Sequence, residues 1–237
     1  MITKKSETMV RAGGIDLYLK RIFALMFGAV GVTALAAFIT MATPLWGMLF
    51  TATGLSPLYY ILMFGGLALS IWAQVRVFSM QPAKAAALLF IYAALVGIVM
   101  TPLLIVAITN NPLTILAAFV LAAIMFACMA LFGYKTVKNL SFLGIFLMMG
   151  MIGLILVGLA SFIWPAIVGG TFGTIVCLIG VLVFALFTAY DMQNLKNAYA
   201  AGGDEHQKNQ LAVLGALHLY ISFIAMFQYL LSLFNRD

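Results

Sequence analysis

Residues 22–75 read IFALMFGAVGVTALAAFITMATPLWGMLFTATGLSPLYYILMFGGLALSIWAQV, a run of 54 residues without a single Asp, Glu, Lys or Arg. A helix needs about 20 apolar residues to cross the hydrocarbon core of a bilayer. This run therefore has room for two crossings and a turn between them. Pro44 and the segment 54–57, which begins with Gly and ends with Pro, supply the breakers near its middle. The stretch predicts a hairpin of two transmembrane helices.

Three further charge-free runs extend this pattern along the chain. Residues 85–134, 139–190 and 209–235 lack charged side chains over 50, 52 and 27 residues. The first two fit a helix pair each, with turns expected at 110–112 and 164–170, and the last fits one helix. The sequence thus predicts an all-α membrane protein with seven transmembrane helices, at about 22–43, 57–78, 85–108, 113–134, 140–163, 168–190 and 210–234.

The composition excludes an ordinary soluble domain. Hydrophobic residues make up 65% of the chain and charged residues only 8%, and the mean hydropathy is +1.17. Lys and Arg outnumber Asp and Glu by 12 to 6. These few, scattered cations do not form the basic stripe of a nucleic-acid-binding protein, so the expected partner is the lipid bilayer. No motif in the chain calls for a cofactor.

Positive charge predicts the orientation in the membrane. The amino terminus, the 76–84 and 135–138 turns and the 191–208 loop together hold 11 of the Lys and Arg residues, and the three opposite turns hold none. Because Lys and Arg of short loops stay in the cytoplasm, the amino terminus is expected to be cytoplasmic. Residues 1–21 then form a cytoplasmic tail and residues 22–235 the seven-helix domain, in a bacterial inner membrane.

Two charged residues lie at the edges of predicted spans. Asp191 ends the sixth charge-free run, on a helix expected to continue towards Tyr199 before Gly202-Gly203 stops it, and Arg76 ends the second span at a similar depth. Charged groups within a membrane are costly and need a partner or a wet cavity. An ion pair between Asp191 and Arg76, closing the cytoplasmic mouth, is one interpretation. The other places Asp191 in the headgroup region, facing water.

The last predicted span carries His218 and Ser222 four residues apart, so both share one helix face. One interpretation is that they line a polar path through the bundle, where His218 could add pH sensitivity near neutrality. The alternative is a neutral, hydrogen-bonded histidine that serves packing alone. The positions do not choose between the two.

Enzymatic motifs are missing from the sequence. An aspartyl protease of the membrane needs two carboxylates that share a proton, and only Asp191 lies at a span. The zinc-binding H-E-x-x-H helix, the G-x-S-x-G elbow and the phosphate-binding loop do not occur. We therefore expect a protein that is not an enzyme.

Three segments lie, in order, at the ends of the fourth, sixth and seventh spans. They are Ala130-Leu131-Phe132-Gly133-Tyr134-Lys135-Thr136 followed by Leu140-Ser141 and Gly144, then Phe187-Thr188-Ala189-Tyr190-Asp191-Met192-Gln193, and then Leu214-Gly215-Ala216-Leu217-His218-Leu219-Tyr220. Together they resemble the Bax inhibitor-1 (transmembrane Bax inhibitor motif) family, in its bacterial, YccA-like branch, and the resemblance runs over most of the chain.

The resemblance implies a fold of six helices around a central seventh, with a cytoplasmic amino terminus. It also implies a pH-sensitive calcium leak channel, in which aspartates of the sixth and seventh helices share protons and interact with an arginine of the second. Asp191 matches the first aspartate, and Arg76 is the counterpart proposed for the arginine. Ser222 stands where the family has the second aspartate. Because serine does not ionise, Asp191 beside Arg76 should titrate as an ordinary paired carboxylate.

Two functions of different class follow as expectations. The first is a passive leak for calcium or another cation, gated by Asp191 and Arg76, with His218 or Ser222 lining the path. The second is a non-conducting modulator or substrate of a membrane protease, or a partner in a stress response, because YccA-like relatives resemble substrates and modulators of the protease FtsH. A secondary transporter is disfavoured by the odd number of spans and the scarcity of intramembrane carboxylates.

Overall fold

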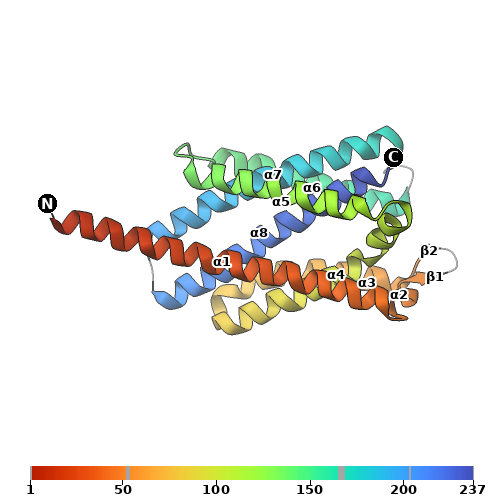
Figure 1. Cartoon of the computed structure of the whole chain (residues 1–237), viewed down its shortest axis with the longest axis horizontal. Helices are drawn as coiled ribbons and strands as arrows, with labels where there is room; N and C mark the ends of the chain where they lie inside the picture. Colours follow the sequence, from red (N-terminus) through yellow and green to blue (C-terminus); the bar gives the residue numbers. More distant parts are fainter. Residues whose placement is uncertain (1, 52–53, 165–168, 203, 237) are drawn as a thin grey trace. The chain divides into compact units, whose positions relative to one another are not determined.

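The computed structural model describes residues 2–51, 54–164, 169–202 and 204–236, with side chains from Gly14 onward except those of Phe78 and Ile163. The described chain is almost entirely helical (Figure 1). In chain order its elements are α1 (Ile2–Ala42), α2 (Leu45–Met48), β1 (Phe50–Thr51), β2 (Gly54–Leu55), α3 (Pro57–Arg76), the 3-10 turn η1 (Val77–Ser79), α4 (Pro82–Asn110), α5 (Leu113–Lys135), α6 (Ser141–Ile163), α7 (Gly170–Ala200) and α8 (Glu205–Phe234).

Seven helices of the described chain are long and apolar enough to cross a membrane, which confirms the predicted number of spans. The spanning segments are Gly14–Ala42, Pro57–Arg76, Pro82–Asn110, Leu113–Lys135, Ser141–Phe162, Gly170–Ala200 and Glu205–Phe234. Each overlaps its predicted range. Helix α1 begins at Ile2, so helical backbone runs through most of the segment predicted as a tail. The division of the chain at residue 21 stays a prediction.

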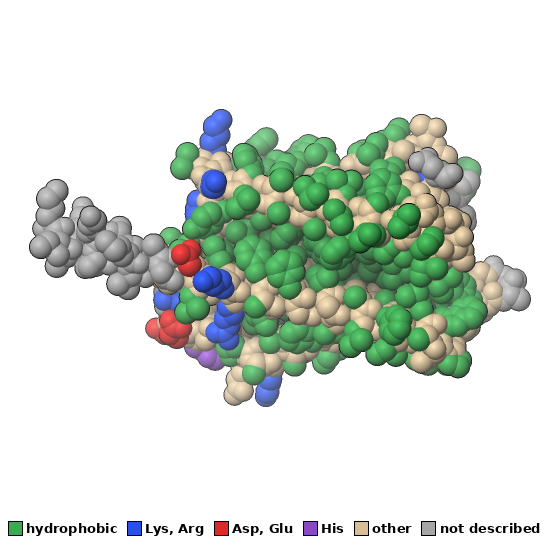
Figure 2. Space-filling model, viewed as in Figure 1, with side chains coloured by type: hydrophobic (Ala, Val, Ile, Leu, Met, Phe, Trp, Pro, Cys, Tyr) green, Lys and Arg blue, Asp and Glu red, His purple; other side chains and the backbone are tan. Residues whose placement is uncertain are grey.

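The outer surfaces of the helices are apolar. Hydrophobic side chains cover most of the face seen in Figure 2. Phe142 and Ile145 on α6 are 85% and 67% exposed, and Val75 on α3 is 73% exposed. A soluble protein rarely leaves so many large hydrophobic side chains in water, whereas lipid tails solvate them.

Helix α8 differs from the other spans in its burial. In its most apolar stretch 72% of the residues are buried inside the protein, against 11% for α6 and 44% for α7. Every residue from Lys208 to Phe234 is buried or partly buried, so this helix presents no fully exposed stripe to lipid. This burial favours the predicted central position of the seventh span, which stays a prediction.

The helix ends follow local sequence rules. Ser56 caps α3 by accepting a hydrogen bond from the Tyr59 amide at 3.3 Å, and Pro57 occupies the first helical position. Later in the chain, α7 continues to Ala200, as predicted, and Gly202 follows with φ of +86°. That left-handed conformation favours glycine and ends the helix. Gly203, the second predicted breaker, lies outside the described residues.

Two of the three predicted non-cytoplasmic turns are described in whole or in large part. Helices α4 and α5 meet at 110–112, as predicted. The first turn is more elaborate than expected, because α2 and an antiparallel pairing of β1 with β2 follow Pro44. The strands pair Phe50 with Leu55 and Thr51 with Gly54. The third turn was predicted at 164–170, and its residues 165–168 lie outside the described chain.

The chain divides into two compact units. Unit 1 comprises Met1–Pro102 and Leu195–Tyr220, and unit 2 comprises Leu103–Asn194 and Ile221–Asp237. The first division falls at Pro102, inside α4, where proline removes a backbone hydrogen bond of the helix. Helix α8 therefore contributes its first half to unit 1 and its second half to unit 2.

Unit 1 is held together by small residues and a buried polar contact. A Cβ atom on Gly97 of α4 would lie 2.4 Å from the Thr33 carbonyl oxygen of α1, so the two helices approach closely. The Thr33 hydroxyl lies 2.7 Å from the hydroxyl of Tyr220 on α8 and donates to the Ala93 carbonyl at 3.0 Å. Both side chains are almost fully buried. One threonine thus joins α1, α4 and α8.

Unit 2 packs α5, α6 and α7 with the second half of α8. Leu147 and Leu154 of α6 form a buried cluster with Val183 of α7. On α8, the ring of Phe223 meets Phe119 and Phe126 of α5 edge-on, with centroids 5.6 and 5.7 Å apart. Aromatic and aliphatic contacts therefore hold this unit.

Candidate functional site

Asp191 lies inside the spanning segment of α7, in unit 2. Its side chain is partly buried, between Thr188 and Ala189, which are fully buried, and Met192, which is 2% exposed. A carboxylate within a transmembrane helix is expensive and is most often functional. The structure therefore keeps Asp191 as the leading candidate.

Two glycines bring neighbouring helices onto the turn that carries Asp191. A Cβ atom on Gly133 of α5 would lie 2.1 Å from the Ala189 carbonyl oxygen, and one on Gly144 of α6 would lie 2.6 Å from the ring of Tyr190. Side chains at these positions would collide with backbone or with a large ring. Helix α7 is consequently held at van der Waals contact by α5 and α6 just before Asp191.

Gln193 ties the turn between α5 and α6 to the same part of α7. Its Oε1 atom accepts a hydrogen bond from the Leu140 amide at 2.8 Å, and its Nε2 atom donates to the Lys138 carbonyl at 2.8 Å. The side chain is 6% exposed. In the sequence, Gln193 belongs to a segment that resembles the family and has no predicted role. The sequence feature that could have pointed to Gln193 is its position two residues after the candidate carboxylate of Asp191.

Arg76 is the last residue of α3, in unit 1, and its side chain is exposed. A cation there interacts favourably with the negative end of the helix dipole. Its carbonyl oxygen accepts a hydrogen bond from the Ser79 hydroxyl at 2.9 Å, at the start of the turn into α4. Asp191 belongs to unit 2, so the ion pair between the two stays a prediction.

His218 lies on α8 in unit 1, partly buried and hydrogen-bonded. Its Nε2 atom is 3.1 Å from Oε1 of Gln74 on α3. The Nε2 atom of Gln74 donates in turn to the Ser70 carbonyl at 3.2 Å. Because the Gln74 Oε1 atom only accepts, the histidine Nε2 atom carries the hydrogen. Gln74 was not singled out from the sequence, although it is a polar residue inside the charge-free run 22–75.

Ser222 follows on α8, in unit 2, and is 3% exposed. It directly precedes Phe223, whose ring packs against α5. Helical spacing sets it one turn beyond His218, as the sequence predicted. Tyr220 lies between them and is fully buried with its hydroxyl on Thr33, a contact that the sequence did not reveal.

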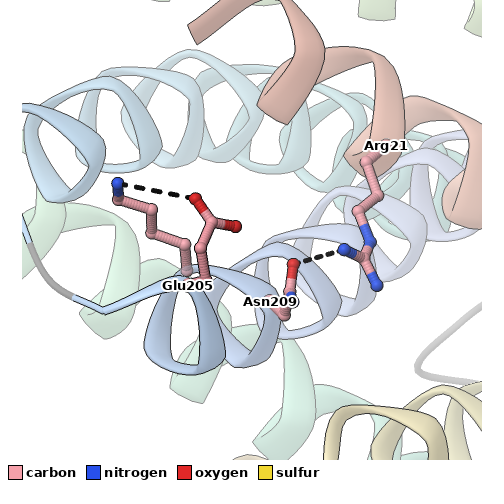
Figure 3. A network of polar contacts seen from close by, with 4 residues as sticks. Arg21, Glu205 and Asn209 are labelled. Carbon is pink, nitrogen blue, oxygen red and sulfur yellow. Dashed lines mark hydrogen bonds and ion pairs between the residues drawn. The ribbon is translucent and has the colours of Figure 1, made fainter. Parts of the chain in front are cut away.

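A second polar group gathers where α8 begins, in unit 1 (Figure 3). Arg21 of α1 donates from Nη1 to the Asn209 side-chain oxygen, and Lys208 lies 4.0 Å from the Glu205 carboxylate. Lys208 also lies 5.4 Å from the ring centroid of Tyr199 at the end of α7. These contacts fasten the start of α8 to α1 and to the last turn of α7. They lie at the protein surface and are individually weak.

The residues at Asp191 do not form a strong cation site. Among the residues that the structure describes, no three His, Cys, Asp or Glu side chains come together in a way that could hold a metal ion. Calcium prefers six to eight oxygen ligands, several of them carboxylates.

Comparison with known proteins gives the family. The profile described as "Inhibitor of apoptosis-promoting Bax1" matches residues 16–237. The inner membrane protein YbhL of Escherichia coli is 31% identical over 237 residues, covering 98% of this chain and 97% of YbhL. An uncharacterized protein of Caulobacter vibrioides is 36% identical over 78% of this chain and 72% of its own length. YrjE of Lactococcus lactis, also uncharacterized, is 32% identical over 96% of each chain.

The family profile and the match to YbhL cover nearly the whole chain and reach into all seven spanning helices, in agreement with the resemblance seen in its motifs. The name of YbhL describes a membrane protein without stating an activity. The chain is therefore a multi-pass membrane protein that belongs to the Bax inhibitor-1 family.

Proposed function

We propose that this protein is a passive leak pathway for cations, with calcium as the permeant ion, in a bacterial inner membrane. The observation that carries the proposal is the Asp191 carboxylate, which lies within a spanning helix and is held there by two close helix contacts. A charged group inside a spanning helix is costly and needs a partner, so Asp191 can hold the path closed through an ion pair and open it when the pair is lost. The amino terminus is cytoplasmic in this proposal, because Lys and Arg gather in the loops on its side.

Each candidate residue has a role in this proposal. Asp191 pairs with Arg76 at the cytoplasmic mouth, and loss of the pair opens the path. His218 and Ser222 line the path along α8. The hydrogen bond between His218 and Gln74 supports such a role, because it gives this stretch of α8 a polar neighbour. The protein conducts rather than catalyses.

Calcium entry into dye-loaded proteoliposomes tests this proposal directly. We expect protein-dependent flux between about pH 6 and pH 8, the range in which a histidine titrates. Arg76→Ala should raise the flux, because it removes one half of the proposed pair. Lys84→Ala is the matched control, since Lys84 is an exposed cation near the same α3–α4 connection. Well-folded protein without flux at any pH would contradict the leak.

A second candidate function is that of a substrate or modulator of a membrane protease of the FtsH type. The observation that favours it is the charged stretch before the first apolar run, which holds Lys4, Lys5, Glu7 and Arg11 and lies on the helical backbone that begins at Ile2. It leaves an amino-terminal segment outside the span, where a processive protease could engage the chain. This function needs no ion path.

Deletion of residues 2–12 separates the two functions. We expect calcium flux to stay at the wild-type level, because the deletion ends before Gly14, which packs against Tyr199. The measurement pairs flux in proteoliposomes with the half-life of the protein in cells. The protease function would be favoured instead if the deletion variant has a longer half-life than the full-length protein and the full-length protein conducts no calcium.

A further inference from the structure

Helices α5 and α6 contact α7 on the face opposite Asp191, which we call the clasped face and which comprises Ala189, Tyr190 and Gln193. Successive residues of an α-helix are about 100° apart around its axis. Ala189 and Gln193 therefore lie about 40° from each other, and Tyr190 lies within about 60° of Gln193. These three residues make the contacts with Gly133, with the α5–α6 turn and with Gly144. Asp191 lies about 200° from both Ala189 and Gln193, on the other side of the helix.

The contacts on the clasped face differ in what they fix. The glycine contacts set how near the helices come, and apolar packing of this kind is not directional. Gln193 makes two directional hydrogen bonds, both at 2.8 Å and both to backbone atoms of the turn at 138–140. Because the side chain is buried, water does not readily replace these bonds. These two directional bonds favour one rotation of α7 at this level.

From this geometry we infer that Gln193 is a positioning residue, which sets the direction of the Asp191 carboxylate by fixing the rotation of α7. Gln193 touches no ion itself. Gln193 also joins the α5–α6 turn to α7, the helix that carries Asp191. A displacement of this turn would therefore be transmitted to Asp191 through the Gln193 side chain. Because the role is defined through Asp191, it rests on the proposed function.

Labelling of Asp191 with a hydrophobic carbodiimide tests the inference without any flux. The probe modifies carboxyl groups, and mass spectrometry of reconstituted protein reports the rate at Asp191 relative to the exposed Glu205. We expect Gln193→Ala to raise this relative rate about threefold to fivefold, the effect of losing hydrogen bonds that hold one orientation. Gln193→Met keeps the length of the side chain and loses both hydrogen bonds, so it should behave like the alanine variant.

Hydrogen exchange at the Leu140 amide provides the second measurement. Exchange there should speed up about fivefold in Gln193→Ala, because the amide loses its partner. Gln207→Ala is the matched control, since Gln207 is an exposed glutamine on α8, and it should change neither measurement.

The outcomes distinguish this inference from the proposed function. Faster exchange at Leu140 with no rise in Asp191 labelling would overturn the positioning role, because the two hydrogen bonds of Gln193 would then act on the turn alone. Unchanged exchange would overturn it too, because these bonds would then not hold in the membrane. A rise in both rates, in a protein whose wild type shows no calcium flux, would support the positioning role and contradict only the leak.

Discussion

Asp191→Asn is expected to raise the calcium leak of reconstituted protein about fivefold at neutral pH. Loss of an ion pair worth about 1 kcal/mol shifts the equilibrium between closed and open protein by this factor. Asparagine has nearly the volume of aspartate, so the packing of α7 against α5 and α6 should survive. The charge that holds the proposed latch closed is lost. Initial rates of dye fluorescence, corrected for the amount of folded protein in the vesicles, measure the effect.

Asp204→Asn is the control for this variant, because Asp204 is an exposed acid of the α7–α8 loop and should leave the leak unchanged. The double variant with Arg76→Ala tests the pairing itself. Groups that act on one interaction are not additive, so the double variant should leak no more than either single one. Equal leak from wild type and Asp191→Asn would exclude Asp191 from gating, and additive effects would exclude the pair.

Gly133→Ala is expected to destabilise the folded protein by about 2 kcal/mol or more, as overpacking of a tight interface does. The added methyl group would lie 2.1 Å from the Ala189 carbonyl oxygen, 2.7 Å from its Cα and 2.8 Å from its carbonyl carbon. All three are backbone atoms, which cannot turn aside as a side chain can. Helices α5 and α7 must separate, with loss of their contact.

Gly153→Ala is the matched control, on α6 of the same unit. A Cβ atom there meets nothing within 4 Å. Alanine also favours the helix over glycine by about 0.5–1 kcal/mol, so this variant should be neutral or slightly more stable. The melting temperatures of the two variants in detergent can be compared by heating each protein and measuring the loss of its monodisperse peak in size-exclusion chromatography. If Gly133→Ala melts at or above the wild-type temperature, α5 and α7 do not meet as closely as the Gly133 contact requires.

The number of spans and their approximate positions could be predicted from sequence because the physical rule is local. Uncharged runs long enough for the hydrocarbon core must cross it, and each run ends where Lys, Arg, Asp or Glu returns. The end of α7 was predictable for a similar reason, because the glycine at 202 accommodates a backbone that other residues avoid. The α2 helix and the β1–β2 pairing were not predicted, since such short elements depend on contacts of the turn rather than on a pattern.

The candidate carboxylate was also found from sequence, because a lone acid at the end of an apolar run is conspicuous. Its surroundings were not. Gln193 reaches back more than 50 residues to Leu140 and Lys138, and Gln74 reaches His218 across 144 residues. No local pattern in an apolar chain specifies which polar side chain meets which.

By itself, then, the sequence determined an all-α membrane protein of seven spans and singled out Asp191, because the cost of charge in lipid acts on each segment separately. Only the tertiary structure decided that Gly133 and Gly144 admit α7 so closely and that Gln193 bonds to the turn at 138–140 from the face opposite Asp191. The reason is that a glycine or an amide looks the same in a sequence whether it faces lipid, a neighbouring backbone or another helix turn. The fold decides which neighbour such a residue contacts, and that neighbour decides its role.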